Sequence, residues 1–238
     1  MVTNDRGYDG DLRELRQRIL LMAGRVEQMI EDSVKALIEQ NHDLARQTIS
    51  RDRDVNRDEI ETDELCLTIL SRRSPVGSDL RLITRALKMV TDIERIGDLA
   101  VNISERALLI NGNMPVHSYE GIPEISRLVQ AMIRDGIDAF VERDVERAKQ
   151  VVIQDERVDQ LYRAFFQELE RQMVSGTVDI TTGIHIHAVA KFLERMGDHG
   201  TNIAEEIIYM VKGKDVRHPG KGGAPSPSSS HGGAHVVL

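Results

Sequence analysis

The stretch ERIGDLAVNISE, residues 94–105, decides the fold of this chain because it occurs twice. One hundred residues later it returns as ERMGDHGTNIAE, residues 194–205, and seven of the twelve positions are identical. A shorter match at an offset of 103 precedes each copy and pairs Asp52 with Asp155, Val55 with Val158, and Asn56 with Asp159. We conclude that the chain contains an internal repeat.

The segments around the repeated stretch have the composition and periodicity of helices. Leu, Ala, Glu, Arg, Gln and Met are plentiful, aromatic residues make up only 3%, and there is no Trp. Apolar residues in the first segment alternate steps of three and four, the spacing of a bundle helix, at Leu12, Leu15, Ile19, Met22, Val26 and Met29. The sequence therefore predicts an all-α fold.

Turn and cap residues divide the chain into six helices. We expect helices over 12–40, 43–70, 79–110, 123–141, 144–174 and 178–212, separated by residues that favour caps and turns. In the first half, Asp43 is expected to cap the second helix, residues 71–78 to form a loop with Ser78 or Asp79 as the cap of the third helix, and the Asn-Gly-Asn sequence at 111–113 to end that helix. In the second half, Pro123 is expected in the first turn of the fourth helix, Asp144 as the cap of the fifth, and residues 175–177 as the break before the last.

The helices group into two tandem three-helix bundles. We expect a first repeat over residues 10–112 and a second over 120–212. From residue 213 to 238 the composition shifts to Gly, Pro, Ser and His, which cannot bury enough apolar surface to offset chain entropy. We therefore expect a disordered C-terminal tail.

Composition excludes several classes of protein. The net charge of −8 disfavours nucleic-acid binding, which needs a basic stripe. No apolar run approaches the ~20 residues that span a bilayer, and the N-terminus lacks the apolar segment of a secretory signal. The single cysteine, Cys66, lies in an apolar helical stretch and suits a reducing compartment. We expect a soluble cytoplasmic protein.

Each repeated stretch places oxygen ligands on one helix face, opposite the predicted core face of Ile96, Leu99 and Ile103 or of Met196, Ile203 and Ile207. The two stripes are Glu94, Asp98, Asn102 and Glu105, and Glu194, Asp198, Asn202 and Glu205. The preceding helices carry Asp52 with Asn56, and Asp155 with Asp159, at a spacing of four. Carboxylate and amide oxygens without thiolates suit hard cations, iron or manganese. The stripes therefore predict acidic metal-binding or partner-binding patches.

The alternative is that these acids form an ordinary solvated helix face. Like charges four residues apart destabilise a helix by a few tenths of a kcal/mol, and a glycine in a helix interior costs about 1 kcal/mol. Because both halves keep the acids beside Gly97 or Gly197, the patch interpretation is favoured. The histidines give weaker signals: His185, His187 and His199 are expected in the core or a groove, and His231 and His235 in solvent.

These residues resemble the PhoU family. Residues 79–81 and 92–103 look like the motif of its first repeat, and residues 187–199 look like that of the second. The resemblance spans residues 10–212 and implies two three-helix bundles related by a pseudo-twofold axis. It also implies iron or zinc clusters held by Glu94 with Asp98, Glu194 with Asp198, and Asp155 with Asp159. Asn56 departs from the pattern as a neutral ligand in the fourth pair.

The resemblance implies a regulatory function rather than an enzymatic one. Members of the family repress phosphate-starvation signalling and restrain phosphate uptake. They connect the ATPase subunit of the phosphate ABC transporter to a sensor histidine kinase, so contact with the membrane comes only through partners. We therefore expect a cytoplasmic adaptor that acts as a homodimer and binds no nucleic acid.

Two alternatives come from other classes of protein. One is a metal-binding helical bundle with iron-dependent enzymatic or storage activity, although the acids are predicted to face away from the core, and no phosphate loop of the Walker type is present. The other is a metal-free helical scaffold whose acidic surfaces receive basic helices of a partner.

Overall fold

The computed structural model describes residues 5–110 and 120–213. Within these ranges the chain forms six helices and no strand, which confirms the all-α prediction. The helices are α1 (Asp5–Ile38), α2 (His42–Arg73), α3 (Gly77–Leu109), α4 (Ile122–Glu142), α5 (Val145–Val174) and α6 (Ile180–Lys212).

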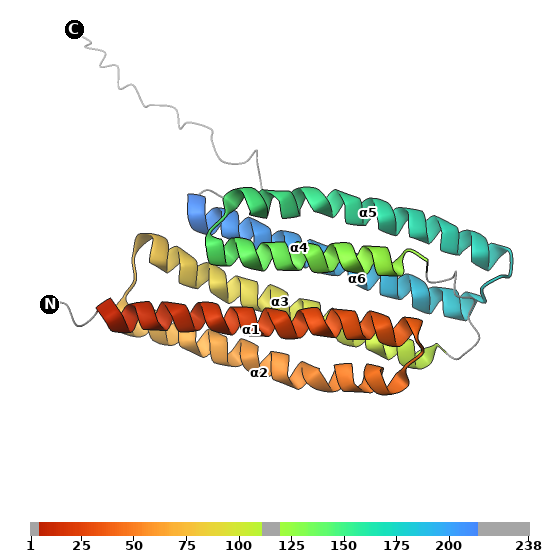
Figure 1. The fold of residues 1–238 in the computed structure, drawn as a ribbon, viewed down its shortest axis with the longest axis horizontal. Helices are drawn as coiled ribbons and strands as arrows, with labels where there is room; N and C mark the ends of the chain where they lie inside the picture. Colours follow the sequence, from red (N-terminus) through yellow and green to blue (C-terminus); the bar gives the residue numbers. More distant parts are fainter. Residues whose placement is uncertain (1–4, 111–119, 214–238) are drawn as a thin grey trace, which may run out of the picture.

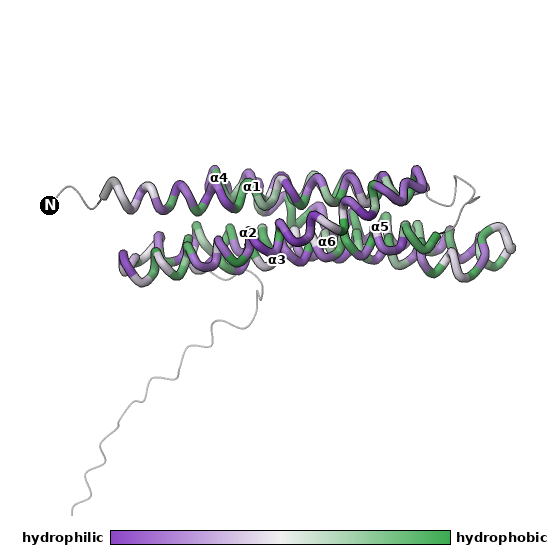
Figure 2. The backbone as a smooth tube through the Cα atoms, turned by 90° about the horizontal axis from the view of Figure 1, so that it is seen from below, coloured by the Kyte–Doolittle hydropathy of each residue, from purple (hydrophilic) through white to green (hydrophobic). Residues whose placement is uncertain are grey.

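The helices pack as two groups of three. α1 packs on α2 and α3, α4 packs on α5 and α6, and the groups meet where α3 contacts α6 and α1 contacts α4. The α2–α3 turn and the α5–α6 turn lie at opposite ends of the molecule (Figure 1). In the view from below, α1 and α4 form one layer and the other four helices form the second (Figure 2). The order of helices across that second layer is α2, α3, α6, α5.

The predicted core positions are buried. Leu12 is 8% exposed, and the other five apolar residues of the first seam have no exposed surface. The predicted core faces of α3 and α6 are buried as well, and Cys66 is a buried core residue. Among the largest fully buried side chains is Phe140, on α4, in a core that is otherwise mainly aliphatic.

Several predicted helix ends are confirmed. Pro123 lies in the first turn of α4, and α5 ends at Val174. The Asp144 side chain caps α5 by accepting hydrogen bonds from the backbone N–H groups of Glu146 and Arg147.

Two predicted caps are wrong. Asn41, not Asp43, caps α2, because its side-chain oxygen accepts the N–H of Leu44. α3 begins at Gly77 without a side-chain cap, before the predicted Ser78 or Asp79. The loop before α3 is shorter than predicted because nothing interrupts α2 ahead of Pro75.

The first helix also starts earlier than its apolar pattern indicates. α1 begins at Asp5 rather than near Leu12, and its first turns pack on the end of α2. There the Nε of Arg73 donates to Asp11 at 2.9 Å. This contact joins residues 62 positions apart, so local sequence gave no sign of it.

Some predictions lie outside the described residues. These are the helix stop at 111–113, the disordered tail beyond Gly213, and the positions of His231 and His235. The division into repeats over 10–112 and 120–212 stays a prediction of domain organisation. Over the described residues, none of the six helices combines the length and apolar character needed to cross a bilayer.

Candidate functional site

Carboxylates of α2 and α3 meet in what we call the first acidic cluster, made of Asp52, Asn56, Glu59, Asp63, Glu94 and Asp98. Asp52, Asn56, Glu59 and Asp63 come from α2, and Glu94 and Asp98 come from α3. On α3 the backbone at Gly97 faces the core, where an added Cβ would lie 3.4 Å from Val55 and 3.6 Å from Val26 of α1. Glu94 and Asp98 lie about 60° and about 100° around that helix from Gly97, beside this contact, as a period of about 100° per residue predicts.

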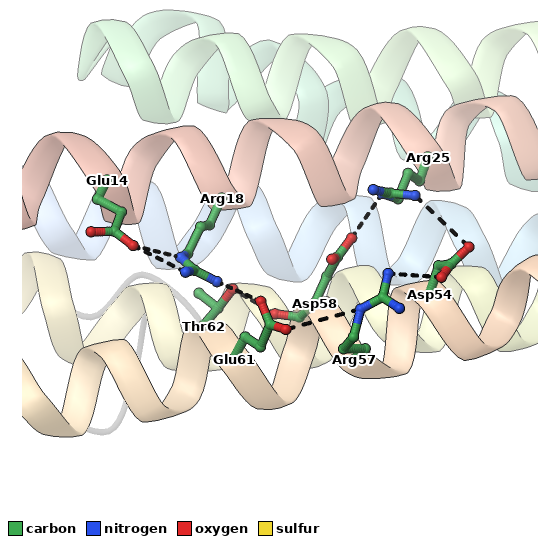
Figure 3. Close-up of polar contacts among 8 residues, drawn as sticks. All are labelled: Glu14, Arg18, Arg25, Asp54, Arg57, Asp58, Glu61 and Thr62. Atoms are coloured by element: carbon green, nitrogen blue, oxygen red, sulfur yellow. Dashed lines mark hydrogen bonds and ion pairs between the residues drawn. The ribbon is translucent and has the colours of Figure 1, made fainter.

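The two edges of α2 are electrostatically different. On the edge facing α1, each acid has an arginine partner: Arg18 lies 2.8 Å from Glu61, Arg25 lies 2.9 Å from Asp58, and Arg57 lies 2.8 Å from Asp54 (Figure 3). The edge facing α3 carries the first acidic cluster instead. Its ion pairs within the described residues come from Arg95, which lies 3.4 Å from Glu94 and 3.1 Å from Asp98.

Burial, and then the charges of neighbouring acids, raise the pKa values of Glu94, Asp52 and Glu59 in the first acidic cluster. Burial, followed by the charge of Asp98, raises the pKa of Glu94 to about 7, against the opposing effect of Arg95. Burial and then the same Asp98 charge raise the pKa of Asp52, whose Oδ2 accepts a hydrogen bond from Asn56 at 2.9 Å. Burial followed by the charge of Asp63 raises the pKa of Glu59. The cluster is therefore short of positive charge.

The second acidic cluster occupies the equivalent place between α5 and α6 and consists of Asp155, Asp159, Glu194 and Asp198. Burial, then the charges of Asp198 and Asp159, raise the pKa of Asp155 to about 6. Burial and then Glu194 raise the pKa of Asp198. At Gly197 an added Cβ would lie 3.3 Å from Oδ1 of Asp155, so glycine lets α5 and its carboxylate approach α6 closely.

Lys191 and Arg163 are the cations of the second acidic cluster, and Arg163 lies 3.8 Å from Asp159. Lys191 makes the shorter contact. Its Nζ donates to Oε1 of Glu194 at 2.6 Å and lies 5.3 Å from the centroid of the Tyr162 ring. The other oxygen of Glu194 is buried and accepts no hydrogen bond from the described residues. Oε2 of Glu94 in the first cluster is also buried and accepts no hydrogen bond from the described residues, although it forms an ion pair with Arg95. Each cluster thus holds a buried carboxylate oxygen with spare acceptor capacity.

A polar seam joins the two bundles between the clusters. Nδ1 of His199 lies 2.8 Å from Oδ1 of Asp92, and Asn202 donates to the same oxygen at 3.2 Å. Glu206, with a side chain only 6% exposed, pairs with Arg85 at 2.8 Å. These contacts explain how charged residues are accommodated where α3 packs on α6.

An acidic cavity of about 560 Å³ opens at this seam. It is lined by Asp63, Leu87, Lys88, Thr91, Asp92, Asn202, Glu205 and Glu206. Asp63 also belongs to the first acidic cluster, because its charge acts on Glu59. The cavity therefore continues the first cluster toward α6, so that acids from three helices border one surface.

The structure brings only some of the predicted metal ligands together. It brings Glu94, Asp98, Asp52 and Asn56 together, and likewise Glu194, Asp198, Asp155 and Asp159. Asn202 lies instead at the seam against Asp92, and Asn102 is half-buried with no hydrogen bond to the first cluster among the described residues. Sequence reasoning overlooked Glu59 and Asp63, although both continue the helical spacing from Asp52 and Asn56.

The donors suit a hard cation in chemistry but are not assembled as a metal centre. Within 5–110 and 120–213, no group of three or more His, Cys, Asp or Glu side chains is close enough to hold a metal ion. The only Glu-x-x-His spacing in the sequence, Glu39 to His42, crosses the turn between α1 and α2, and Glu39 is exposed there. The arrangement therefore offers no di-iron pair projecting into either core.

The three described histidines of α6 have different surroundings. His187 Nε2 lies 2.9 Å from the Tyr162 hydroxyl, and its ring lies 4.6 Å from the centroid of Phe166. His185 Nδ1 lies 3.4 Å from Arg106. His199 contacts Asp92 at the seam, so the expectation of a core or groove histidine fits its position.

The fold and clusters can now be compared with known proteins. The model of the PhoU domain matches residues 19–107 and 122–207. The phosphate-specific transport system accessory protein PhoU homolog of Pseudomonas putida is 40% identical over 215 residues, covering 90% of this chain and 84% of that protein. The phosphate-specific transport system accessory protein PhoU of Escherichia coli K12 is 34% identical over 213 residues, covering 90% of this chain and 88% of that protein.

Solved structures agree with the sequence relatives. The crystal structure of PhoU from Pseudomonas aeruginosa has a TM-score of 0.83 and 38% identity, covering 87% of this chain and all of that one (100%). The phosphate transport system regulatory protein PhoU from Streptococcus pneumoniae has a TM-score of 0.82 and 26% identity, covering 88% and 99%. The chain therefore belongs to the PhoU domain family.

Proposed function

We propose that this protein is a regulatory accessory of phosphate-specific transport that represses phosphate uptake and phosphate-starvation signalling. In this proposal it is a non-enzymatic cytoplasmic adaptor, acting as a homodimer, between the ATPase subunit of the phosphate ABC transporter and a sensor histidine kinase. The observation that carries the proposal is the similarity to accessory proteins of that system over 90% of the chain.

The acidic clusters supply the proposed contact with partners. The first acidic cluster and the seam cavity present carboxylates from α2, α3 and α6, and the second acidic cluster adds those of α5. Arg95, Lys191 and Arg163, each about half-exposed, only partly offset this charge. A basic helix of a partner would neutralise buried carboxylates whose pKa values are already raised. The pattern of charges along the clusters would fix the position of that helix on the surface.

Metal ions are the second proposed ligand of the clusters. Glu194, Asp198, Asp155 and Asp159 would hold iron or zinc in the second cluster, and Glu94, Asp98, Asp52 and Asn56 in the first. The bound metal would supply the positive charge that each site lacks. Spare acceptor capacity on Glu94 and Glu194 supports this fit, as does a donor set made of oxygen atoms. Asn56 makes the first cluster the weaker site because an amide is a neutral ligand.

Metal content after purification without tag or chelator tests the metal proposal. We expect iron, zinc or manganese in the wild type and its loss in a folded variant carrying Glu194→Gln and Asp198→Asn. A control carrying Glu64→Gln and Glu105→Gln removes two exposed acids from α2 and α3 and should keep the metal. Wild-type protein that stays empty after loading would leave partner recognition as the role of the acids.

Deletion of the gene tests the regulatory proposal. In cells grown with abundant phosphate, we expect higher phosphate uptake and higher phosphatase expression in the deletion strain, both reversed by complementation. The strain must lack any second gene of the family, since a paralogue would hide the loss. Unchanged uptake and expression in that background would refute the proposal.

A further inference from the structure

The C-terminal tail carries its positive charge next to the point where α6 ends. Of the 25 residues that follow Gly213, three are basic, and all three occur among the first eight, at Lys214, Arg217 and Lys221. One acid, Asp215, lies among them, and residues 222–238 contain no Asp, Glu, Lys or Arg. We call residues 214–221 the basic segment. Its excess of positive charge contrasts with the net charge of −8 of the whole chain.

The basic segment begins on the helix face that lines the seam cavity, the acidic cavity of about 560 Å³ between α3 and α6. Gly213 ends α6 in a left-handed conformation, with φ of 67°. At about 100° per residue, it lies within roughly 20° of Asn202 and Glu206 around the helix, and both of these line the cavity. The start of α3 is close by, since Nε of Arg81 donates to the carbonyl oxygen of Met210 at 3.3 Å. The chain therefore leaves the fold at one end of the seam.

The basic segment is long enough to cover the cavity. Glu206 precedes Gly213 by seven residues and Asn202 precedes it by eleven, which is about 10 Å and about 16 Å along a helix. An extended chain spans about 3.3 Å per residue, so Arg217 reaches about 13 Å from Gly213 and Lys221 about 26 Å. A segment that turns back along α6 can therefore bring Arg217 level with Glu206, and Lys221 past the far end of the cavity.

The seam cavity is short of positive charge. Its charged lining residues are four acids and one base: Asp63, Asp92, Glu205, Glu206 and Lys88. Lys88 lies 3.5 Å from Glu206, which Arg85 also approaches, at 2.8 Å. Asp92 contacts His199 and Asn202 rather than a lysine or arginine of the described residues. Asp63 makes no ion pair within 5–110 and 120–213, and its buried Oδ1 has no hydrogen-bond partner there. The acids from α2 and α3 therefore lack a lysine or arginine partner in this part of the chain.

We propose that the basic segment binds in the seam cavity of the same molecule. Arg217 and Lys221 there lie against carboxylates of α2, α3 and α6, and the planar guanidinium of Arg217 suits a carboxylate partner. Each such surface ion pair is weak by itself. Attachment within reach of the cavity compensates for this, because a short flexible linker gives the segment an effective concentration in the millimolar range.

The competition that follows from this binding rests on the proposed function. In the adaptor proposal a basic helix of a partner approaches the same carboxylates, so the basic segment and the partner exclude one another. A partner then binds only the fraction of molecules in which the cavity is open, which lowers its apparent affinity. The tail is in this sense a competitor built into the chain.

Zero-length carbodiimide cross-linking of the purified full chain, read by mass spectrometry, tests the binding of the segment. The reagent joins a lysine amine to a carboxylate that it contacts. We expect both lysines of the basic segment to be linked to acids of the seam cavity in preference to Glu146. This exposed acid lies at the start of α5, at the same end of the molecule as the end of α6 (Figure 1). Links from Lys88 to Glu206 and from Lys149 to Glu146, which lie 3.5 Å and 2.7 Å apart, show that both regions react.

Arg217→Glu should lower the ratio of cavity links to Glu146 links about 5- to 30-fold, because it replaces an attraction by a repulsion. Residue 217 lies beyond α6, so the six helices should keep their fold. Added salt should act in the same direction. Ser228→Glu introduces the same side chain outside the basic segment and should leave the ratio unchanged.

A ratio that neither Arg217→Glu nor salt changes would overturn the proposal. So would cavity links that form only between molecules in a mixture of isotope-labelled and unlabelled protein, because the occupant would then be the tail of a second copy.

Titration of the transporter ATPase subunit onto wild type and Arg217→Glu tests the competition separately. We expect tighter binding to Arg217→Glu, and equal or weaker binding would refute the competition. If the cavity links form but the subunit binds neither protein, the binding of the segment stands and the adaptor proposal fails.

Discussion

Replacement of Glu94 by glutamine should stabilise the protein at neutral and alkaline pH. The side chain of Glu94 is 13% exposed, and burial together with Asp98 raises its pKa from 4.5 to about 7. Glutamine keeps the shape of the side chain and removes the charge. The ion pair that it loses, to an Arg95 side chain that is 56% exposed, contributes little.

The pH dependence follows from the raised pKa. Below about pH 4.5 Glu94 is protonated in both the folded and unfolded protein, so the charge costs nothing. Between pH 4.5 and 7 the unfolded chain ionises first, and the wild type loses stability as pH rises. At about 1.4 kcal/mol per pKa unit, the shift from 4.5 to about 7 gives a full cost above pH 7 of at most roughly 3.5 kcal/mol. Solvent near the carboxylate reduces our expectation to about 1–2 kcal/mol.

Urea unfolding at pH 5 and pH 8, with chelator present, measures this effect. We expect Glu94→Gln to gain about 1–2 kcal/mol over wild type at pH 8 and much less at pH 5. Glu105→Gln, an exposed acid on the same helix, is the matched control and should show no such pH dependence. A Glu94→Gln variant that is less stable than wild type at pH 8, or equally affected at both pH values, would refute the reasoning.

Four further substitutions test the packing and one helix cap, each by urea unfolding at pH 7. Gly24→Ala, where an added Cβ meets nothing within 4 Å, should stabilise by up to about 1 kcal/mol, whereas Gly197→Ala should not, since its Cβ would press on Asp155. Equal gains at both glycines would contradict the close approach. Phe140→Ala should cost about 3–5 kcal/mol because the ring is fully buried, and a cost below 1 kcal/mol would count against that core. Asp144→Ala should cost about 1 kcal/mol through loss of the α5 cap; no change would mean that the cap is dispensable.

Features with a local period could be predicted from the sequence. The seam that starts at Leu12 and the core faces around Ile96 and Met196 are buried as expected, because a helix fixes which side chains share a face. The close approaches at Gly97 and Gly197 also follow from the cost of glycine in a helix. For α2, two nearby cap-forming residues, Asn41 and Asp43, left the start of the helix open by two positions. For α3, the helix starts at Gly77 without any side-chain cap, so cap-forming residues could not locate its start.

Features that depend on the packing of one bundle against the other could not be predicted. The contact of His199 with Asp92 joins residues 107 positions apart, and that of Glu206 with Arg85 joins residues 121 apart. Asn202 was expected in an acidic stripe because the repeat aligns it with Asn102, but the neighbouring bundle provides its partner. A sequence repeat predicts equivalent positions within each bundle, but it does not predict the contacts between the two bundles.

Binding of the transporter ATPase subunit tests the proposed adaptor most directly. We would titrate the purified subunit from the same organism onto the wild type, onto Asp155→Asn with Asp198→Asn, and onto the Glu64→Gln with Glu105→Gln control. The account predicts salt-sensitive binding that the cluster variant weakens and the control keeps, with chelator showing whether metal contributes. Absence of binding to folded wild type, or equal binding by the cluster variant, would contradict it.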